Sequence, residues 1–279
     1  MLISRTLPGM ELGRPVGRAT VIALTDAEGP FFQSRQAAFP EATTAQWQQA
    51  DARDPAAVTA DGRWWLRFRC FAIRLDAGPA GARTILVDAG VGPGNTPTWV
   101  PVPGRLPAEL AAAGITPDEV DTVVLTHLHT DHLGWAVTGD PGTPYFRNAR
   151  YLLQRTEVEA VRRAAPQLAA RVLDPLADTG QLTAVDGEQR ISPGVRLIPT
   201  PGHTPGHQSV LVTGPDEELL ITGDLLVHAV QLVAPEVAYA HEDDPVAARR
   251  SRQALLADRA GRPALVLGTA HLGTPFVPV

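Results

Sequence analysis

Residues 126–134, Thr-His-Leu-His-Thr-Asp-His-Leu-Gly, constrain this chain more than any other segment. They follow the apolar run Val-Val-Leu at 123–125, which predicts a buried strand that ends where the backbone turns. Side chains alternate along an extended segment, so His127 and His129 point to the same side, while Asp131 and His132 follow in the turn. Imidazole nitrogens and carboxylate oxygens are ligands of zinc and similar divalent ions. The density of ligands favours a metal site over solvated loop histidines.

Three later segments also place a polar side chain just beyond an apolar run or in a Gly/Pro loop. His203 lies in Thr-Pro-Gly-His-Thr-Pro-Gly-His at 200–207, Asp224 follows Leu-Leu-Ile-Thr-Gly at 219–223, and His271 follows Leu-Val-Leu-Gly-Thr-Ala at 265–270. Open sheets commonly bind ligands at the ends of their strands. We therefore expect these three side chains to join the first cluster at one rim of a sheet.

The order His-x-His-x-Asp-His, then His, Gly-Asp and His, resembles the metallo-beta-lactamase superfamily over residues 88–271. The resemblance implies an α/β (α+β) fold, a four-layer αβ/βα sandwich, formed by residues 1–279 as a single domain. It implies two metal ions, one held by His127, His129 and His203, the other by Asp131, His132 and His271, with Asp224 bridging the pair. Leu-Val-Asp-Ala-Gly at 86–90 resembles the family's early strand-turn motif, whose aspartate, here Asp88, supports the site without binding metal.

Two adjacent divalent ions predict hydrolytic chemistry. Ions roughly 3.5–4 Å apart can share a bridging hydroxide, because coordination lowers the pKa of water toward about 7. We expect this hydroxide to attack a carbonyl or phosphoryl centre while the metals stabilise the oxyanion, and Asp131 to move a proton to the leaving oxygen as well. A histidine and carboxylate set accepts zinc, our first expectation, and also iron, manganese or cobalt.

Two segments indicate the substrate class. Residues 200–209, Thr-Pro-Gly-His-Thr-Pro-Gly-His-Gln-Ser, resemble N-acyl homoserine lactonases, and the tail from Gly-Asp-Leu at 223–225 to Ala-His-Leu at 270–272 is similar to methyl parathion hydrolases. The resemblance implies a metal-dependent hydrolase of a small-molecule lactone or other ester, with phosphotriesterase side activity. Those lactonases carry a tyrosine shortly after the bridging aspartate, whereas the nearest one here is Tyr239. The contact to the substrate oxyanion would then come from His228 or from elsewhere, and simple packing of His228 is equally open.

Other functions fit the sequence less well. Asp224 argues against true β-lactamases, and the chain ends shortly after His271, before the thioester-binding region that hydroxyacylglutathione hydrolases need. Another hydrolase of the same fold, acting on a thioester or a β-lactam, stays an alternative. A non-catalytic metal-binding protein that recognises a small molecule or a partner is an alternative of a different class.

The composition agrees with a compact enzyme: 279 residues, 44% hydrophobic and 19% charged, with a net charge of −6 and arginine as the only basic residue. The absence of a basic stripe argues against nucleic-acid binding. No run reaches the roughly 20 apolar residues of a membrane span, and no hydrophobic signal segment opens the chain, so we expect a cytoplasmic protein. Cys70, the only cysteine, lies in an alternating strand and is predicted to be a core thiol.

The remaining pattern predicts strands near 19–25, 64–75, 84–88 and 149–154, and a helix over 107–113. Thr156 and Glu159 are expected to form a capping box for the next helix. Asp244 followed by proline should start the last helix, which runs toward Ala260. Residues 31–59 are interpreted as an insertion that covers the pocket or mediates a homodimer.

Three more side chains lie close to the motifs. His207 is expected to hydrogen-bond to backbone rather than to bind metal. His241 is expected at the surface. Trp135 is assigned either to the pocket wall or to the core.

Overall fold

Two β-sheets dominate the computed structural model, which describes residues 13–78, 81–94, 103–257 and 263–279. The first sheet has seven strands in the order β1-β2-β3-β4-β5-β8-β9. They are β1 (Gly13–Val16), β2 (Ala19–Pro30), β3 (Trp65–Gly78), β4 (Gly81–Val87), β5 (Val120–Val124), β8 (Arg150–Gln154) and β9 (Leu182–Val185). Strands β1 to β4 pair antiparallel, whereas β4, β5, β8 and β9 run parallel. Parallel neighbours need crossover connections, which here contain helices.

The second sheet has six strands in sequence order. They are β10 (Gln189–Ser192), β11 (Val195–Pro199), β12 (Gln208–Thr213), β13 (Glu217–Ile221), β14 (Ala264–Gly268) and β15 (Phe276–Pro278). Only the β13–β14 pair is parallel, so the carboxyl ends of these two strands reach the same edge. A small ribbon is formed by β6 (Val137–Thr138) and β7 (Thr143–Pro144).

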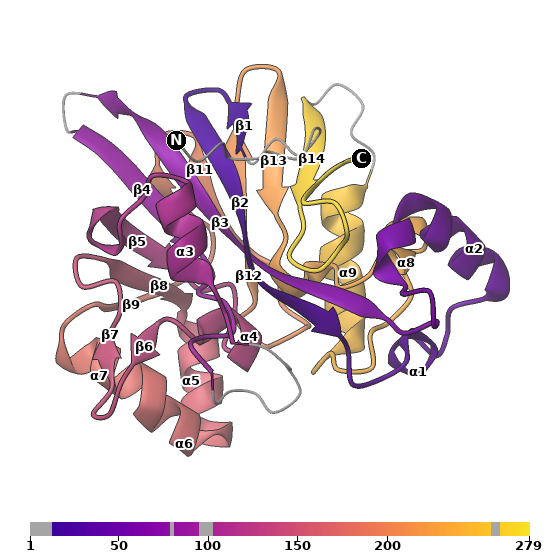
Figure 1. Ribbon diagram of the computed structural model, residues 1–279, viewed down its shortest axis with the longest axis horizontal. Helices are drawn as coiled ribbons and strands as arrows, with labels where there is room; N and C mark the ends of the chain where they lie inside the picture. Colours follow the sequence, from indigo (N-terminus) through magenta and orange to yellow (C-terminus); the bar gives the residue numbers. More distant parts are fainter. Residues whose placement is uncertain (1–12, 79–80, 95–102, 258–262) are drawn as a thin grey trace, which may run out of the picture.

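The helices cover the outer faces of the sheets and one end of the molecule. On the first sheet lie α3 (Leu106–Ala112), α4 (Thr130–Leu133), α5 (Arg155–Ala164), α6 (Pro166–Leu168), the π-helical turn η3 (Ala169–Leu173) and α7 (Asp174–Asp178). On the second lies α9 (Pro245–Leu256). At the end lie α1 (Arg35–Ala38), α2 (Thr44–Arg53) and α8 (Val230–Val233). Single 3-10 turns are η1 (Pro55–Ala57), η2 (Pro117–Glu119) and η4 (Gly223–Leu225). Figure 1 shows the strands between α3, α5, α6 and α7 on one side and α9 on the other.

Three apolar layers hold this arrangement together. Between the sheets, residues such as Phe71, Ile85 and Val210 are fully or almost fully buried. On the outer face of the second sheet, Leu267 packs with Leu255 of α9. A third layer lies under α3, α5 and α7 on the outer face of the first sheet. Burial of this apolar surface is the main force that holds the layers together. The order helix, sheet, sheet, helix confirms the predicted four-layer sandwich.

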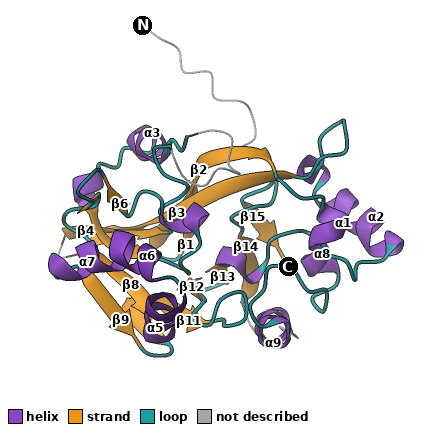
Figure 2. Ribbon diagram, turned by 90° about the horizontal axis from the view of Figure 1, so that it is seen from below, coloured by secondary structure: helices purple, strands orange, loops and turns teal. Residues whose placement is uncertain are grey.

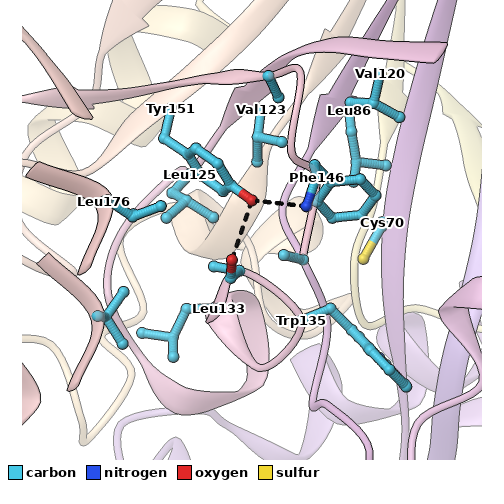
Figure 3. Close-up of a cluster of buried hydrophobic side chains, with 14 of the residues drawn as sticks. Cys70, Leu86, Val120, Val123, Leu125, Leu133, Trp135, Phe146, Tyr151 and Leu176 are labelled. Carbon is cyan, nitrogen blue, oxygen red and sulfur yellow. Dashed lines mark hydrogen bonds between the residues drawn. The ribbon is translucent and has the colours of Figure 1, made fainter. Parts of the chain in front are cut away.

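The outer core of the first sheet also fixes the loop that follows α4 (Figure 3). The buried hydroxyl of Tyr151 donates to the carbonyl oxygen of Ala136 at 3.0 Å and accepts the N–H of Phe146 at 3.3 Å. Cys70 lies in the same cluster with no exposed surface, and burial raises the pKa of its thiol. The prediction of a packed core thiol is confirmed.

Asp26 on β2 connects three segments that are far apart in the sequence. Its fully buried carboxylate accepts the backbone N–H groups of Val91 and Leu106, both at 2.6 Å, and Nε1–H of Trp135 at 3.0 Å. Burial raises the pKa of Asp26, while these hydrogen bonds lower it. Trp135 is therefore a core residue, which resolves the alternative left open by the sequence.

Residues 31–59 form α1, α2 and η1, which gather with α8 at one end of the molecule (Figures 1 and 2). Thr43 caps α2 with a complete capping box. Phe39 and Trp64 are buried there with their ring centroids 5.6 Å apart. This end is thus a packed extension of the sandwich. A homodimer through this segment stays a prediction.

Of two predicted helix starts, one is wrong and one is confirmed. The capping box at Thr156 and Glu159 is wrong, because α5 begins at Arg155 and its N-cap, Gln154, makes no side-chain cap bond. Thr156 is already the second residue of the helix and cannot be its N-cap. The start of α9 is confirmed, since Asp244 accepts two N–H groups of the first turn. Its expected continuation to Ala260 lies mostly outside the described residues.

No helix among the described residues combines the length and the apolar character that crossing a bilayer requires.

Candidate metal centre

All seven predicted ligands lie at one edge of the sandwich. His127 and His129 follow β5, Asp131 and His132 belong to α4, His203 lies between β11 and β12, Asp224 lies in η4 after β13, and His271 follows β14. Figure 1 shows α4 below the middle of the molecule, where the two sheets meet. The structure therefore brings together side chains that are up to 144 residues apart in sequence.

The first group of ligands consists of His127, His129, His203 and Asp224, whose ligand atoms all lie within 4.8 Å of one another. Nδ1 of His129 is 3.0 Å from Nε2 of His127 and 2.9 Å from Nε2 of His203. Burial lowers the pKa of His127 well below its ordinary value and that of His129 to about 4. Both rings are therefore neutral near pH 7, as metal binding requires.

The second group consists of Asp131, His132 and His271, again with ligand atoms within 4.8 Å of one another. The outer nitrogen of each ring has a fixed partner: Nδ1 of His132 lies 2.9 Å from Oδ2 of Asp88, and Nδ1 of His271 lies 2.7 Å from the carbonyl oxygen of Arg67. Such partners fix the tautomer of a histidine and direct the other nitrogen inward.

Asp224 lies between the two groups. Its Oδ1 is 2.9 Å from Nε2 of His271 and 3.1 Å from Nε2 of His132, while Oδ2 is 3.2 Å from Nε2 of His203. Although burial alone would raise the pKa of Asp224, the surrounding His132, His271 and His203 hold it well below the ordinary value. This is the position that a carboxylate bridging two ions must occupy.

These contacts allow a direct test of whether the residues fit metal ions. His132 and His271 both direct Nε2 toward Asp224, and although burial alone would lower the pKa of the two rings, the facing carboxylate of Asp224 raises it. Among the described residues, the buried Nε2 of His132 has no hydrogen-bond partner. A proton or a metal cation has to lie between these nitrogen atoms and the carboxylate, because lone pairs that face a carboxylate repel it. The donor set and its orientation therefore fit divalent ions.

Asp88 supports both sides of the ligand motif. Besides His132, its carboxylate accepts the backbone N–H of Thr126 at 2.8 Å and the Thr126 hydroxyl at 3.0 Å. Asp88 has φ 63°, an uncommon backbone conformation for a residue with a side chain. The surrounding hydrogen bonds hold this strained turn, as is common at functional sites. The supporting role predicted for Asp88 agrees with this geometry.

His207 supports Asp224 through the backbone. Its Nε2 accepts the N–H of Asp224 at 3.0 Å, and its Nδ1 donates to the hydroxyl of Thr200 at 2.8 Å. Burial lowers the pKa of His207 to about 3, so the ring stays neutral. Since the Nε2 lone pair is already used, His207 is not available as a metal ligand, and the prediction of a backbone contact is confirmed.

Two glycines of the His203 loop allow helices to approach it. A Cβ at Gly202 would lie 2.0 Å from the backbone nitrogen of Ala248 on α9, and one at Gly206 would lie 2.2 Å from that of Glu157 on α5. Such contacts cannot be relieved by a side-chain rotation, because the nearest neighbours are backbone atoms. The repeated Pro-Gly of this loop thus reflects close packing of one helix against each half of the loop.

A cavity of about 320 Å³ opens over both ligand groups. Ligand residues His129, Asp131, His203, Asp224 and His271 form part of its wall. The rest is largely apolar and includes Phe31, Phe32, Leu66, Phe68, Leu168 and Val227. No arginine is among the described residues that line it. The cavity therefore suits a small molecule with an apolar part.

Tyr239 also lines this cavity. Its ring lies between that of Phe39, with centroids 5.1 Å apart, and that of His203, with centroids 6.1 Å apart and planes 11° from parallel. Its hydroxyl makes no hydrogen bond to any residue that the structure describes. Burial raises the pKa of Tyr239, so the hydroxyl stays a donor. It is well placed to donate to a bound ligand.

A buried ion pair holds the segment that carries Tyr239. The guanidinium of Arg252 on α9 contacts the carboxylate of Glu242, and both side chains are fully buried. Arg252 also donates to the carbonyl oxygens of Pro235 and Val237. The segment 235–242 is therefore fixed at both ends to one helix.

The structure places His228 in the core and His241 at the rim of the cavity. His228 is buried against the rings of Trp47 and Trp64, at 5.3 and 5.6 Å between centroids, and is not among the described residues that line the cavity. Its Nδ1 accepts the N–H of Val230 at 3.0 Å. His241 is exposed, as predicted, but it also lines the cavity and contacts Gln33 at 2.8 Å.

Sequence reasoning missed several residues of the site. The sequence identifies Tyr239 only as the nearest tyrosine after Asp224, 15 positions further on, and assigns the oxyanion contact to His228 or elsewhere. Phe31, Phe68 and Leu168 come from separate parts of the chain and meet only in the fold. The one usable signal was the aromatic content of residues 31–59, from which a contribution to the pocket was expected.

Comparisons with known proteins agree with this geometry. The sequence model of the family described as "Metallo-beta-lactamase superfamily" matches residues 69–271. An N-acyl homoserine lactonase of Bacillus thuringiensis is 34% identical over 116 residues, 41% of this chain and 42% of the relative. The N-acyl homoserine lactonase AttM of Rhizobium radiobacter is 34% identical over 131 residues, 42% of this chain and 45% of the relative. The matched segment thus spans about two fifths of the length of these curated relatives.

Solved structures match over nearly the whole chain. The hydrolase AbOPH of the beta-lactamase superfamily has a TM-score of 0.76 at 23% identity, covering 96% of each chain. AidC, a dizinc quorum-quenching lactonase in complex with a product, has the same TM-score at 19% identity and the same coverage. At this identity the likeness shows the fold. Because the family model covers more than half of the sequence and both motifs and fold agree with it, the chain belongs to the metallo-beta-lactamase superfamily.

Proposed function

We propose that this protein is a dinuclear metal-dependent hydrolase that cleaves a small, uncharged lactone or other ester with an apolar substituent. The observation that carries the proposal is the pair of ligand groups joined by Asp224 in the wall of an apolar cavity. Zinc is the proposed metal, because imidazole and carboxylate ligands suit it, and iron, manganese or cobalt are the substitutes to be tested.

The proposed mechanism assigns separate roles to the metals and to the side chains. Two divalent ions bound by this set would supply Lewis acidity and lower the pKa of coordinated water toward about 7. Asp131 lies in the cavity wall, so its carboxylate can take up a proton and pass it to the leaving oxygen. The Tyr239 hydroxyl can donate to the substrate carbonyl or to the leaving oxygen. We do not assign a direct substrate contact to His228, because it packs against the rings of Trp47 and Trp64 and is not among the described residues that line the cavity.

The described lining of the cavity outside the ligands supports an uncharged substrate. Its described wall contains the carboxylates of Asp131 and Asp224 and no arginine, while Phe31, Phe32 and Phe68 provide apolar surface. A β-lactam or a glutathione thioester carries carboxylates, and a carboxylate is held well by an arginine. These two alternatives are therefore less well supported than a neutral ester.

The relatives support the same substrate class. The curated relatives are N-acyl homoserine lactonases. AidC is a lactonase, and its structure is a complex with the product N-hexanoyl-L-homoserine. A lactone is a cyclic ester without charge, in agreement with the cavity. Phosphotriesterase side activity is part of the proposal, because phosphotriesters are also uncharged and expose an electrophilic centre.

A substrate panel tests the proposal. Zinc-loaded protein is assayed with lactones of increasing acyl length, aryl esters, phosphotriesters and a carboxylate-bearing β-lactam. We expect turnover of uncharged substrates, loss of turnover in His129→Ala, and unchanged turnover in the exposed variant Glu159→Gln. Absence of turnover on every substrate while both ions are bound would reject catalysis and favour the non-catalytic alternative.

A further inference from the structure

A buried carboxylate outside the ligand set joins two of the ligand loops. Glu157 lies in the first turn of α5 and is 2% exposed. Its Oε1 accepts the backbone N–H of Leu128 at 2.9 Å, and its Oε2 accepts that of Gly206, also at 2.9 Å. One side chain therefore satisfies buried donors from two loops that are 78 residues apart in sequence.

The two loops carry the histidines of a single ligand group. Leu128 lies between His127 and His129, and Gly206 follows His203 by three residues. These three histidines belong to the first group. We propose that Glu157 is a positioning residue that sets the affinity of the protein for the ion of the first group and leaves the ion of the second group largely unaffected. This inference rests on the proposed dinuclear centre.

We expect the effect to be confined to the ion of the first group, because the histidines of the second group are oriented by other partners. The rings of His132 and His271 are oriented by the Asp88 carboxylate and by the carbonyl oxygen of Arg67. The structure shows no hydrogen bond between either partner and Glu157. Loss of the Glu157 contacts therefore leaves these two orientations in place, apart from effects transmitted through Asp224.

The packing around the carboxylate leaves little room for compensation. A Cβ at Gly206 would lie 2.2 Å from the backbone nitrogen of Glu157, so the loop and the start of α5 are already in contact. The Gly206 loop therefore cannot move toward another acceptor without separating from the helix. Hydrogen bonds from backbone N–H groups to a carboxylate are also stronger than those between neutral groups.

Glu157→Gln is the most conservative test. The amide keeps one acceptor oxygen but turns an NH2 group toward one of the two backbone N–H groups, so one hydrogen bond is replaced by opposed donors. Loss of a partner that orients metal ligands typically costs 10- to 100-fold in metal affinity. We expect a 10- to 100-fold loss of affinity for the ion of the first group and a change of less than about twofold for the ion of the second group.

The experiment titrates metal-free protein with Zn²⁺ in competition with a chromophoric chelator. Wild type should bind two ions, Glu157→Gln should bind one of them 10- to 100-fold more weakly, and Glu159→Gln, the exposed variant of the same helix, should match wild type. Two backgrounds identify the affected ion. In His271→Ala, which removes a ligand of the second group, Glu157→Gln should weaken the remaining ion, whereas in His203→Ala it should have little effect.

The outcomes separate this inference from the proposed function. Wild type that binds fewer than two ions would contradict the dinuclear centre itself. Wild type with two ions and a Glu157→Gln variant that weakens both equally, or neither, would overturn the positioning role alone. Circular dichroism checks folding. If Glu157→Gln does not fold, Glu157→Asp keeps the charge on a shorter side chain that cannot reach both amides, and selective weakening of one ion is again required.

Discussion

The backbone N–H of Asp224 donates to Nε2 of His207 at 3.0 Å, so the carboxylate that joins both ligand groups is held by a histidine from another loop. The other nitrogen of His207 is bound to the hydroxyl of Thr200 at 2.8 Å. Backbone, imidazole and hydroxyl thus form a continuous chain beneath the proposed bridge.

Replacing His207 tests this chain of contacts. His207→Phe keeps a ring of similar width but leaves the N–H of Asp224 and the Thr200 hydroxyl without their partner. We expect the free energy of unfolding to fall by about 1–3 kcal/mol and zinc affinity to fall by about 10- to 100-fold. Thermal unfolding and chelator competition measure the two effects. Unchanged affinity would show that the bridge does not depend on His207.

Gly223 lets Asp224 approach His207. It has φ 52°, and an added Cβ would lie 2.8 Å from Nε2 of His207 and 2.9 Å from the Thr126 side chain. Gly187→Ala is the matched control, since Gly187 has φ 69° and no atom within 4 Å of such a Cβ. We expect about 1–2 kcal/mol of backbone strain in both variants, and further destabilisation with loss of zinc only in Gly223→Ala. Equal behaviour of the two variants would contradict the close approach.

Asp26 should be one of the most sensitive positions outside the site. In Asp26→Asn one carboxylate oxygen becomes an NH2 group, so a buried donor from Val91, Leu106 or Trp135 loses its acceptor. We expect a loss of at least about 1–3 kcal/mol in the free energy of unfolding. The exposed Asp178→Asn should change it by less than about 0.5 kcal/mol. Denaturant unfolding compares the two, and a similar midpoint for both would refute the role of Asp26.

His228 makes stability depend on pH in one direction. Burial, together with the nearby positive charge of Arg35, lowers its pKa to about 3 in the folded protein, against 6.5 for the ordinary group. Between these values the unfolded chain binds more protons, so this contribution to stability is lost as the pH falls from 6.5 toward 3.

The variant His228→Phe removes that contribution and keeps an aromatic ring in the cluster. Below pH 6 we expect wild type to lose up to about 1.4 kcal/mol per pH unit more than His228→Phe. Denaturant unfolding at a series of pH values and equal zinc loading measures the difference. Parallel curves for the two proteins would show that His228 takes up its proton at its ordinary pKa.

The sequence predicted the ligand edge well because strand ends carry local signals. The alternation of His127 and His129 after an apolar run, and the aspartate after Leu-Leu-Ile-Thr-Gly, need no knowledge of distant contacts. The family resemblance supplied the order of the layers.

Tyr239 and Glu157 could not be predicted in this way, because their roles depend on tertiary contacts. Glu157 lies in a segment typical of a helix start, and only the packing of α5 against Gly206 turns its side chain inward. Tyr239 reaches the cavity because Arg252 and Glu242 fix its segment to α9. Neither of these tertiary contacts can be recognised from the sequence.

The central claim is that one chain binds two divalent ions through Asp224. Elemental analysis of protein saturated with zinc and then freed of excess metal, in wild type and in Asp224→Asn, tests it most directly. We expect about two ions per wild-type chain, and weakened binding of both in the variant, since the neutral amide faces both groups. A wild-type chain that retains at most one ion, or a variant that keeps both with unchanged affinity, would contradict it.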